Sequence, residues 1–118
     1  MTELRDVVEG LARRAGVTAV SLVSADGLVI DRCGDDELAD ADEIAALSAT
    51  LARQAISFGS ASTRGDFRAG VLEYAGGMAV LSRAGKDGFL VILTEPGHNV
   101  GPLLFDLQHN APALAALL

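Results

Sequence analysis

The chain has one cysteine, no tryptophan and few aromatic residues, and its shortages exclude several classes of protein. Cys33 stands alone, so no internal disulfide can form, which favours a reducing compartment. Half of the residues are apolar, yet no uninterrupted apolar run approaches the roughly 18 residues that a membrane span requires. The first residues, MTELRDVVEGLARRAG, lack the apolar core of a secretion signal. We therefore expect a cytoplasmic protein without a membrane span.

Basic residues are also scarce, since 9 Lys and Arg stand against 16 Asp and Glu, for a formal net charge of −7. Nucleic acid is a poor partner, because phosphate binding needs clustered Lys and Arg. The acidic residues gather in one stretch, which comprises Asp31, Asp35, Asp36, Glu37, Asp40, Asp42 and Glu43. Asp40 followed by Glu43 predicts a capped helix start. The spacing and the glycine of a calcium loop are missing, so we expect no metal and no cofactor.

The length of 118 residues predicts one domain, residues 1–118. Apolar residues keep helical spacing from Thr2 to Ala15, and a second helix is predicted from Ala41 to Ser57. Between them, Asp26-Gly27 separates two apolar runs and predicts a tight hairpin of type I′. A polar loop covers 57–66, and three strands follow within 67–94. A last helix follows a cap at Asn99 and reaches Leu118, the end of the chain.

This pattern predicts an α/β (α+β) fold in the order αββαβββα, with a five-stranded antiparallel sheet. The run Val17–Val23 is apolar on both of its alternating faces, with Val17, Ala19 and Val23 on one of them. The run Phe89–Leu93 is apolar at every position, which is typical of a strand covered on both sides. We therefore expect helices on both faces of the sheet.

The second predicted helix is apolar over about 200°, against roughly 100° for a helix that covers a sheet and faces water. One stripe is expected to pack on the sheet: Ile44, Leu47, Leu51, Ala55 and Phe58. Beside it lies a second stripe: Ala45, Ala49, Ala52 and Ile56. Either the alanines are good helix formers at exposed positions, or these small residues admit another helix and form a protein contact.

Several segments together resemble the roadblock-type (dynein light chain) domain family, and within it the bacterial MglB-like members. They are GVTAVSLVSADGLVI, the Ala-rich helix, and VLEYAGGMAVLSRAGKDGFLVILTEPGHNVG. The resemblance implies a profilin-like roadblock sandwich, with the second helix on one face and the other two on the opposite face. It also implies a homodimer through the second helix and the third strand, for which the expected interface is Ala45, Ala49, Ala52, Ile56, Phe67, Ala69 and Val71.

The resemblance further implies a non-enzymatic regulator or effector platform that binds a small Ras-like GTPase, with a GTPase-activating role open. The expected partner-binding residues flank the alanine stripe: Glu43, Thr50, Arg53 and Gln54. Arg53 as an arginine finger is the weaker reading, because MglB-like regulators are thought to reshape the GTPase instead. Some MglB-like regulators use C-terminal residues to affect nucleotide exchange, whereas this sequence stops at Leu118. We expect the isolated protein to hydrolyse no GTP, and any effect to appear only as a changed rate in the partner.

No catalytic signature is present. The segments RAGKDG and GSASTRG lack the residues of a phosphate-binding loop. Cys33 with His98 or His109 is the only thiol combination, and we expect a small apolar filler and two surface histidines instead. Two other functions stay open. A ligand-sensing domain would need a concave pocket with convergent polar groups, and a structural adaptor would share every surface feature with a GTPase regulator.

Overall fold

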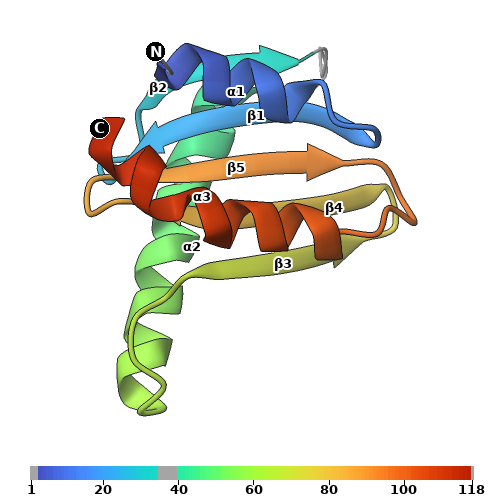
Figure 1. Cartoon of the computed structure of the whole chain (residues 1–118). Coiled ribbons are helices and arrows are strands. Elements are labelled where there is room, and N and C mark those ends of the chain that lie inside the picture. Colours follow the sequence, from blue (N-terminus) through green and yellow to red (C-terminus); the bar gives the residue numbers. More distant parts are fainter. Residues whose placement is uncertain (1–2, 35–39, 118) are drawn as a thin grey trace.

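The computed structural model describes residues 3–34 and 40–117. Its elements follow the predicted order: α1 (Leu4–Ala12), β1 (Val17–Ser24), β2 (Val29–Gly34), α2 (Ala41–Ala61), β3 (Ala69–Tyr74), β4 (Gly77–Ala84), β5 (Gly88–Thr94) and α3 (Gly101–Leu117). The strands form one antiparallel sheet in the order β2-β1-β5-β4-β3. Helices α1 and α3 cover one face of this sheet and α2 crosses the other (Figure 1). The predicted fold is confirmed.

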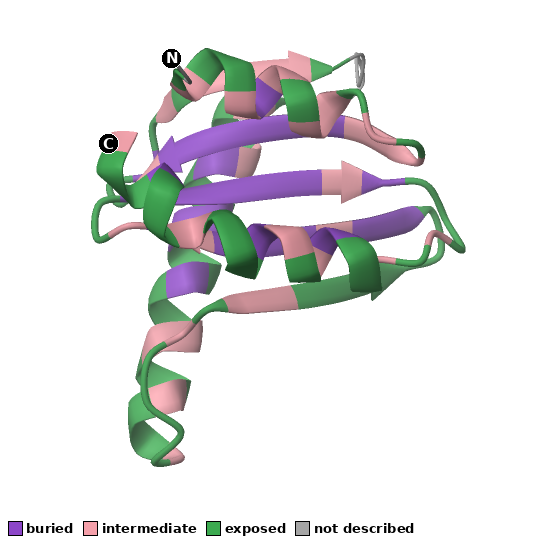
Figure 2. Cartoon of the chain, in the orientation of Figure 1, coloured by how far each residue is buried: buried purple, intermediate pink, exposed green. Residues whose placement is uncertain are grey.

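The central strands β1 and β5 are buried on both faces (Figure 2), which explains their continuous apolar sequence. Val20, Leu22, Leu90 and Ile92 point toward α1 and α3, where they meet the buried residues Val8, Leu103, Leu107 and Leu114. On the other face lie residues that pack with α2: Val23, Leu81, Phe89 and Val91. Val17 was expected on the same face as Val23, but it packs in the α1 and α3 core, because the β1–β5 register shifts between Val17 and Ala19.

The hairpin after β1 forms at the predicted place but with another turn. Ser24 donates a backbone hydrogen bond to Leu28 (2.8 Å), so the loop holds three residues, Ala25 to Gly27. Gly27 has φ +86°, whereas Thr63 is the only non-glycine with positive φ in the described part of the chain. Asp26 therefore lacks the positive φ that type I′ requires, and Gly27 alone supplies the left-handed residue of a three-residue hairpin.

Some helices and strands begin or end at other residues than predicted, notably on either side of the predicted polar loop. Asp40 caps α2 as predicted, since its side chain accepts from the backbone N–H groups of Asp42 (3.0 Å) and Glu43 (3.2 Å). Helix α2 continues to Ala61, past the predicted end at Ser57, since the single glycine in this stretch, Gly59, costs only about 1 kcal/mol in a helix. The first helix is shorter than predicted, and β3 begins at Ala69, two residues later than predicted.

Asp35, Asp36 and Glu37 of the acidic stretch lie outside the described residues. Asp31 lies in β2 and accepts a hydrogen bond from Arg5 of α1 (2.8 Å). This hydrogen bond and the negative charge of Asp31 raise the pKa of the Arg5 guanidinium. Within residues 3–34 and 40–117, no three His, Cys, Asp or Glu side chains come together as metal ligands would. Over the same residues, no helix has the length and apolarity to cross a membrane.

Candidate interaction surface

Helix α2 lies on the sheet through its small residues. Ala45, Ala49 and Ala52 lie on the side of the helix that faces the sheet, and they are buried. The helix also sits directly on the β1–β2 turn, since a Cβ built on Gly27 would come within 3.2 Å of the Ala46 Cα. Larger side chains would not fit at this distance. The expectation that the alanine stripe faces a second copy is therefore wrong in its direction, because its own sheet already covers these alanines.

The larger apolar residues of α2 point outward instead. Leu47, Leu51 and Phe58 are 57%, 45% and 73% exposed, although they were expected to pack on the sheet. They recur at helical spacing along one side of the helix, so they form a single stripe. The second helix thus has the predicted wide apolar arc. Ile44 packs against the α2-side core as expected, and Ala55 is half-buried, whereas the bulkier Leu47, Leu51 and Phe58 are exposed.

The C-terminal part of α2 extends beyond the edge of the sheet (Figure 1). Ala52 is the last buried residue of the helix, and Ile56 is partly buried against the α2-side core. Phe58 lies past this point and is largely exposed. The chain then turns back, and Arg64 donates a backbone hydrogen bond to the Gly59 carbonyl (2.9 Å). The last turns of α2 therefore have no sheet of their own chain beneath them.

Strand β3 is the neighbouring edge of the sheet and is also unusually apolar. It pairs only with β4 among the described strands, so one side of its backbone is free. Val71, Leu72 and Tyr74 are exposed. A hollow of about 480 Å³ lies beside this strand and includes Tyr74, Ala79 and Leu93 among its lining residues, with Leu93 belonging to the α2-side core. An exposed apolar edge of this kind invites pairing with another strand.

The remaining expected interface residues are placed as follows. Phe67 precedes β3 and packs partly into the α2-side core, while Ile56 and Ala69 are half-buried. Val71 is the one expected interface residue that is exposed. The sequence expectation did not identify Leu47, Leu51, Leu72 and Tyr74 as exposed apolar residues. The spacing of Leu47 and Leu51 and the apolar letters on both faces of VLEY were the available signals.

The four expected partner-binding residues, Glu43, Thr50, Arg53 and Gln54, are all exposed on α2. Two of them interact, since Arg53 donates a hydrogen bond through Nη2 to the Thr50 hydroxyl (3.2 Å). The Thr50 hydroxyl in turn donates to the Ala46 carbonyl (3.2 Å). These bonds tie Arg53 to Thr50 on the exposed side of α2, and Glu43 lies at the start of the helix.

The thiol and the two histidines do not converge. Cys33 is partly buried and packs against the α1 and α3 core, as expected for a small apolar filler. His98 is half-buried, not a plain surface residue, because its ring occupies the space that a side chain at position 16 would need. His109 is exposed on α3, where its ring stacks on Phe105.

The antiparallel five-stranded sheet, with one helix on one face and two on the other, is consistent with the roadblock fold. The Roadblock/LC7 domain matches residues 3–94, and the chain belongs to this family. A Roadblock/LC7 domain from Streptomyces avermitilis superposes with a TM-score of 0.84 at 27% identity, over 98% of this chain and 97% of that one. No curated protein sequence matches the chain.

Two MglB structures are also similar. MglB from Myxococcus xanthus has a TM-score of 0.84 at 18% identity, over 98% of this chain and 97% of that one. An MglB with a tetrameric arrangement has a TM-score of 0.81 at 20% identity, over 96% of this chain and 85% of that one. At these identities the likeness establishes the shared fold.

Proposed function

We propose that this protein is a homodimeric, non-enzymatic platform that binds and regulates a small Ras-like GTPase. The observation that carries the proposal is the set of large apolar side chains that α2 and the edge strand β3 leave exposed: Leu47, Leu51, Phe58, Leu72 and Tyr74. Membership of the Roadblock/LC7 family and the similarity to MglB support the same reading. A second copy that covers this surface would remove both the exposed apolar side chains and the free strand edge.

The geometry favours a twofold arrangement. If β3 pairs antiparallel with its copy, the two sheets join edge to edge, and the part of α2 that extends beyond β3 reaches over the sheet of the partner. Phe58 then lies near the hollow that contains Ala79 and Leu93. Burial of a largely exposed Phe or Leu side chain contributes about 1.5–3 kcal/mol. Burial of this stripe in both copies is therefore the main favourable contribution to the proposed dimer.

The dimer is tested with Leu51→Glu. The added charge would be buried between two helices, so the variant should be monomeric in multi-angle light scattering at micromolar concentration, whereas the wild type should be dimeric. Ala46→Glu is the matched control, because Ala46 is exposed on the same helix but away from Leu51. A wild-type protein that is monomeric under these conditions would overturn the dimer.

The GTPase contact is tested with Arg53→Glu, which reverses a charge on the exposed side of α2, at the expected rim of the GTPase contact. Rim charges mainly set the rate of encounter and its salt dependence, so we expect capture to weaken about tenfold while the dimer persists. Arg13→Glu makes the same charge change at the exposed C-cap of α1, on the other face of the sheet, and should leave capture unchanged. The probe is a Ras-like GTPase from the same genome, titrated in its GDP state and with a non-hydrolysable GTP analogue.

These titrations have decisive outcomes. Equal capture by the Arg53→Glu and Arg13→Glu variants would remove α2 as the docking site. Failure of the wild type to bind any Ras-like GTPase of that genome in either state would overturn the regulatory function. We expect the isolated protein to hydrolyse no GTP, so any effect should be a changed hydrolysis or exchange rate in the partner.

A further inference from the structure

The described sheet ends in two edge strands, β2 and β3, and their backbones differ in regularity. Strand β3 pairs with β4 in an unbroken register from Ala69 to Tyr74. The register of β2 with β1 shifts between Leu22 and Val23, so that Ile30 of β2 has no partner residue. A bulge of this kind bends an edge strand and interrupts the row of backbone groups that another strand would need.

Beyond the bulge, both backbone groups of Arg32 bond to side chains. The N–H of Arg32 donates to Oδ1 of Asp31 (2.8 Å), and its carbonyl accepts from Nη1 of Arg5 (2.9 Å). The same Arg5 nitrogen also donates to Oδ1 of Asp31 (2.8 Å). In an antiparallel ladder every second residue directs its N–H and C=O away from the paired strand. The bonds of Arg32 identify it as such a residue, on the free side of β2.

We call the Arg5 guanidinium, the Asp31 carboxylate and the Arg32 backbone the β2 bridge. An ion pair alone would need only Arg5 and Asp31, and the two bonds to the backbone are what place the bridge on the strand edge. Hydrogen bonds between charged groups are shorter and stronger than those between neutral groups. The β2 bridge therefore occupies, with strong bonds, the position in which a neighbouring strand would bond Arg32.

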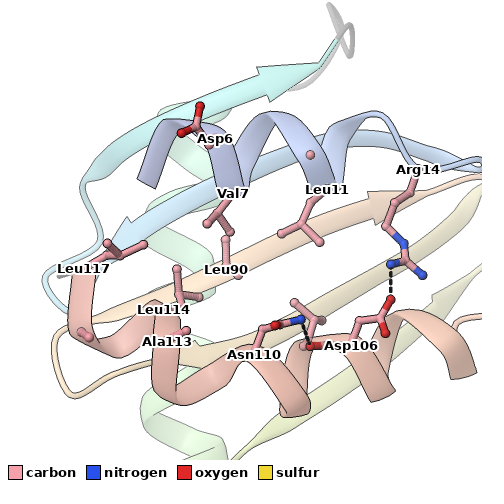
Figure 3. A pocket seen from close by; sticks show the side chains of 13 residues that line it. Asp6, Val7, Leu11, Arg14, Leu90, Asp106, Asn110, Ala113, Leu114 and Leu117 are labelled. Atoms are coloured by element: carbon pink, nitrogen blue, oxygen red, sulfur yellow. Dashed lines mark hydrogen bonds and ion pairs between the residues drawn. The ribbon is translucent and has the colours of Figure 1, made fainter. Parts of the chain in front are cut away.

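Helix α1 is attached to the rest of the molecule by arginines near both of its ends. Arg14, which follows the helix, forms an ion pair with Asp106 of α3, and this pair spans a groove of about 630 Å³ between the two helices (Figure 3). Arg5 lies in the first turn and bonds β2, on the other side of α1 (Figure 1). Arg5 thus approaches the β2 edge from a helix that ion pairs hold at both ends.

Without the β2 bridge, the edge of β2 would attract other strands. Leu28, which precedes β2, is 68% exposed, and Ile30 is 47% exposed. Loss of Arg5 or Asp31 would also leave a backbone group of Arg32 without its present partner. An edge strand that combines open backbone groups with exposed apolar side chains is a template for pairing with another chain.

We propose that the β2 bridge is an inhibitory contact that closes the β2 edge to strand pairing and confines pairing to β3. The closure of β2 depends on the bonds of Arg5, Asp31 and Arg32 alone, whereas the use of β3 rests on the proposed dimer. A chain with two open edges would join β3 of one copy to β2 of the next, and such head-to-tail contacts continue without closing. With β2 closed, only a closed pair through β3 remains.

The first experiment breaks the β2 bridge with Arg5→Ala and follows the full chain by sedimentation from about 10 µM to about 1 mM. Glu9→Ala is the matched control, because it removes the other ion pair of Arg5 and leaves the bonds to β2 in place. We expect the mass of Arg5→Ala to rise with concentration to at least about twice that of the wild type, since its β2 edge is open. Glu9→Ala should match the wild type. Equal masses of the two variants throughout would overturn the proposal.

Asp31→Ala breaks the same bridge from the side of the strand. It removes the acceptor of both Arg5 and the Arg32 N–H, so it should associate as Arg5→Ala does. Circular dichroism establishes that each variant is folded. A folded Asp31→Ala that keeps the mass of the wild type at every concentration would contradict the role of the bridge.

A further variant locates the new contact and separates it from a general loss of stability. Ile30→Lys adds a charge at the bulge of β2, where a charged side chain opposes strand pairing. Combined with Arg5→Ala, it should restore the mass of the wild type. Phe105→Lys adds the same charge on the exposed side of α3 and should not restore it. Association that persists with Ile30→Lys would place the contact away from β2 and overturn the proposal.

Leu51→Glu distinguishes a failure of this proposal from a failure of the proposed dimer. If the dimer is wrong, the wild type and Leu51→Glu have the same mass, yet Leu51→Glu with Arg5→Ala should still pair through β2 at high concentration. If the dimer is right and the closure of β2 is wrong, Leu51→Glu lowers the mass while Arg5→Ala leaves it unchanged.

Discussion

A Cβ built on Gly27 would lie 3.4 Å from the Cβ of Ala49, so the β1–β2 turn and α2 touch with no space between them. Ala49 itself is buried. This contact fixes how deeply α2 sits on the sheet, and it explains why the alanines lie beneath the helix while Leu47 and Leu51 lie outside.

The first prediction concerns this contact. Ala49→Leu adds volume where neither the turn nor the helix can give way, so we expect the free energy of unfolding to fall by about 1–3 kcal/mol. Ala46→Leu is the matched control, since the side chain of Ala46 is exposed and the change should stay within about 0.5 kcal/mol. Urea unfolding of both variants measures the difference. Equal midpoints would show that α2 does not sit on its alanines.

The second prediction concerns two consecutive glycines at the β3–β4 turn. Gly77 has φ +140°, and a Cβ there would collide with the carbonyl oxygen of Thr94, whereas a Cβ on Gly76 would meet nothing within 4 Å. Gly77→Ala should therefore cost about 1–3 kcal/mol of stability. Gly76→Ala should be nearly neutral. Thermal unfolding of both variants measures the difference. A reversed order would contradict the backbone path of this turn.

The sequence was sufficient for the architecture because its signals are local. Continuous apolar runs such as Phe89–Leu93 show strands buried on two faces, and Asp40 marks the start of α2 through a cap that needs only its neighbours. The ends of helices and strands could be predicted less well, because a local signal near an end can fit two structures. The letters SFGSA are compatible with either a helix or a loop, and the structure continues α2 through them to Ala61.

The candidate surface could not be predicted in the same way, because its orientation depends on packing between distant segments. Both stripes of α2 are apolar, so periodicity alone cannot tell which of them meets the sheet. The deciding contact joins Gly27 with Ala46 and Ala49, which are far apart in the sequence. The free edge of β3 likewise follows from the strand order of the whole sheet.

The third prediction links Phe58 to protein concentration. If a second copy covers Phe58, the melting temperature of the wild type should rise with concentration, since association stabilises the folded state by mass action. Phe58→Ser should remove most of this dependence while it leaves the stability at low concentration nearly unchanged, because Phe58 is largely exposed in the single chain. Scans over a hundredfold range of concentration measure the effect. A melting temperature of the wild type that is independent of concentration would argue against a covered Phe58.

The fourth prediction concerns the end of α2, residues 57–61, which extends past the sheet of its own chain (Figure 1). In a single chain these residues have few buried contacts, so their amides should exchange with solvent through local opening, while amides near the buried Ala49 and Ala52 should exchange only through larger unfolding. A partner sheet over this segment would suppress the local opening. Leu51→Glu should therefore speed exchange at 57–61 by at least about tenfold relative to the wild type, with a much smaller change around Ala49 and Ala52. Hydrogen exchange followed by mass spectrometry resolves the two segments, and Ala46→Glu should match the wild type in both. If residues 57–61 exchange equally fast in the wild type and in Leu51→Glu, the end of α2 is not covered by a second copy.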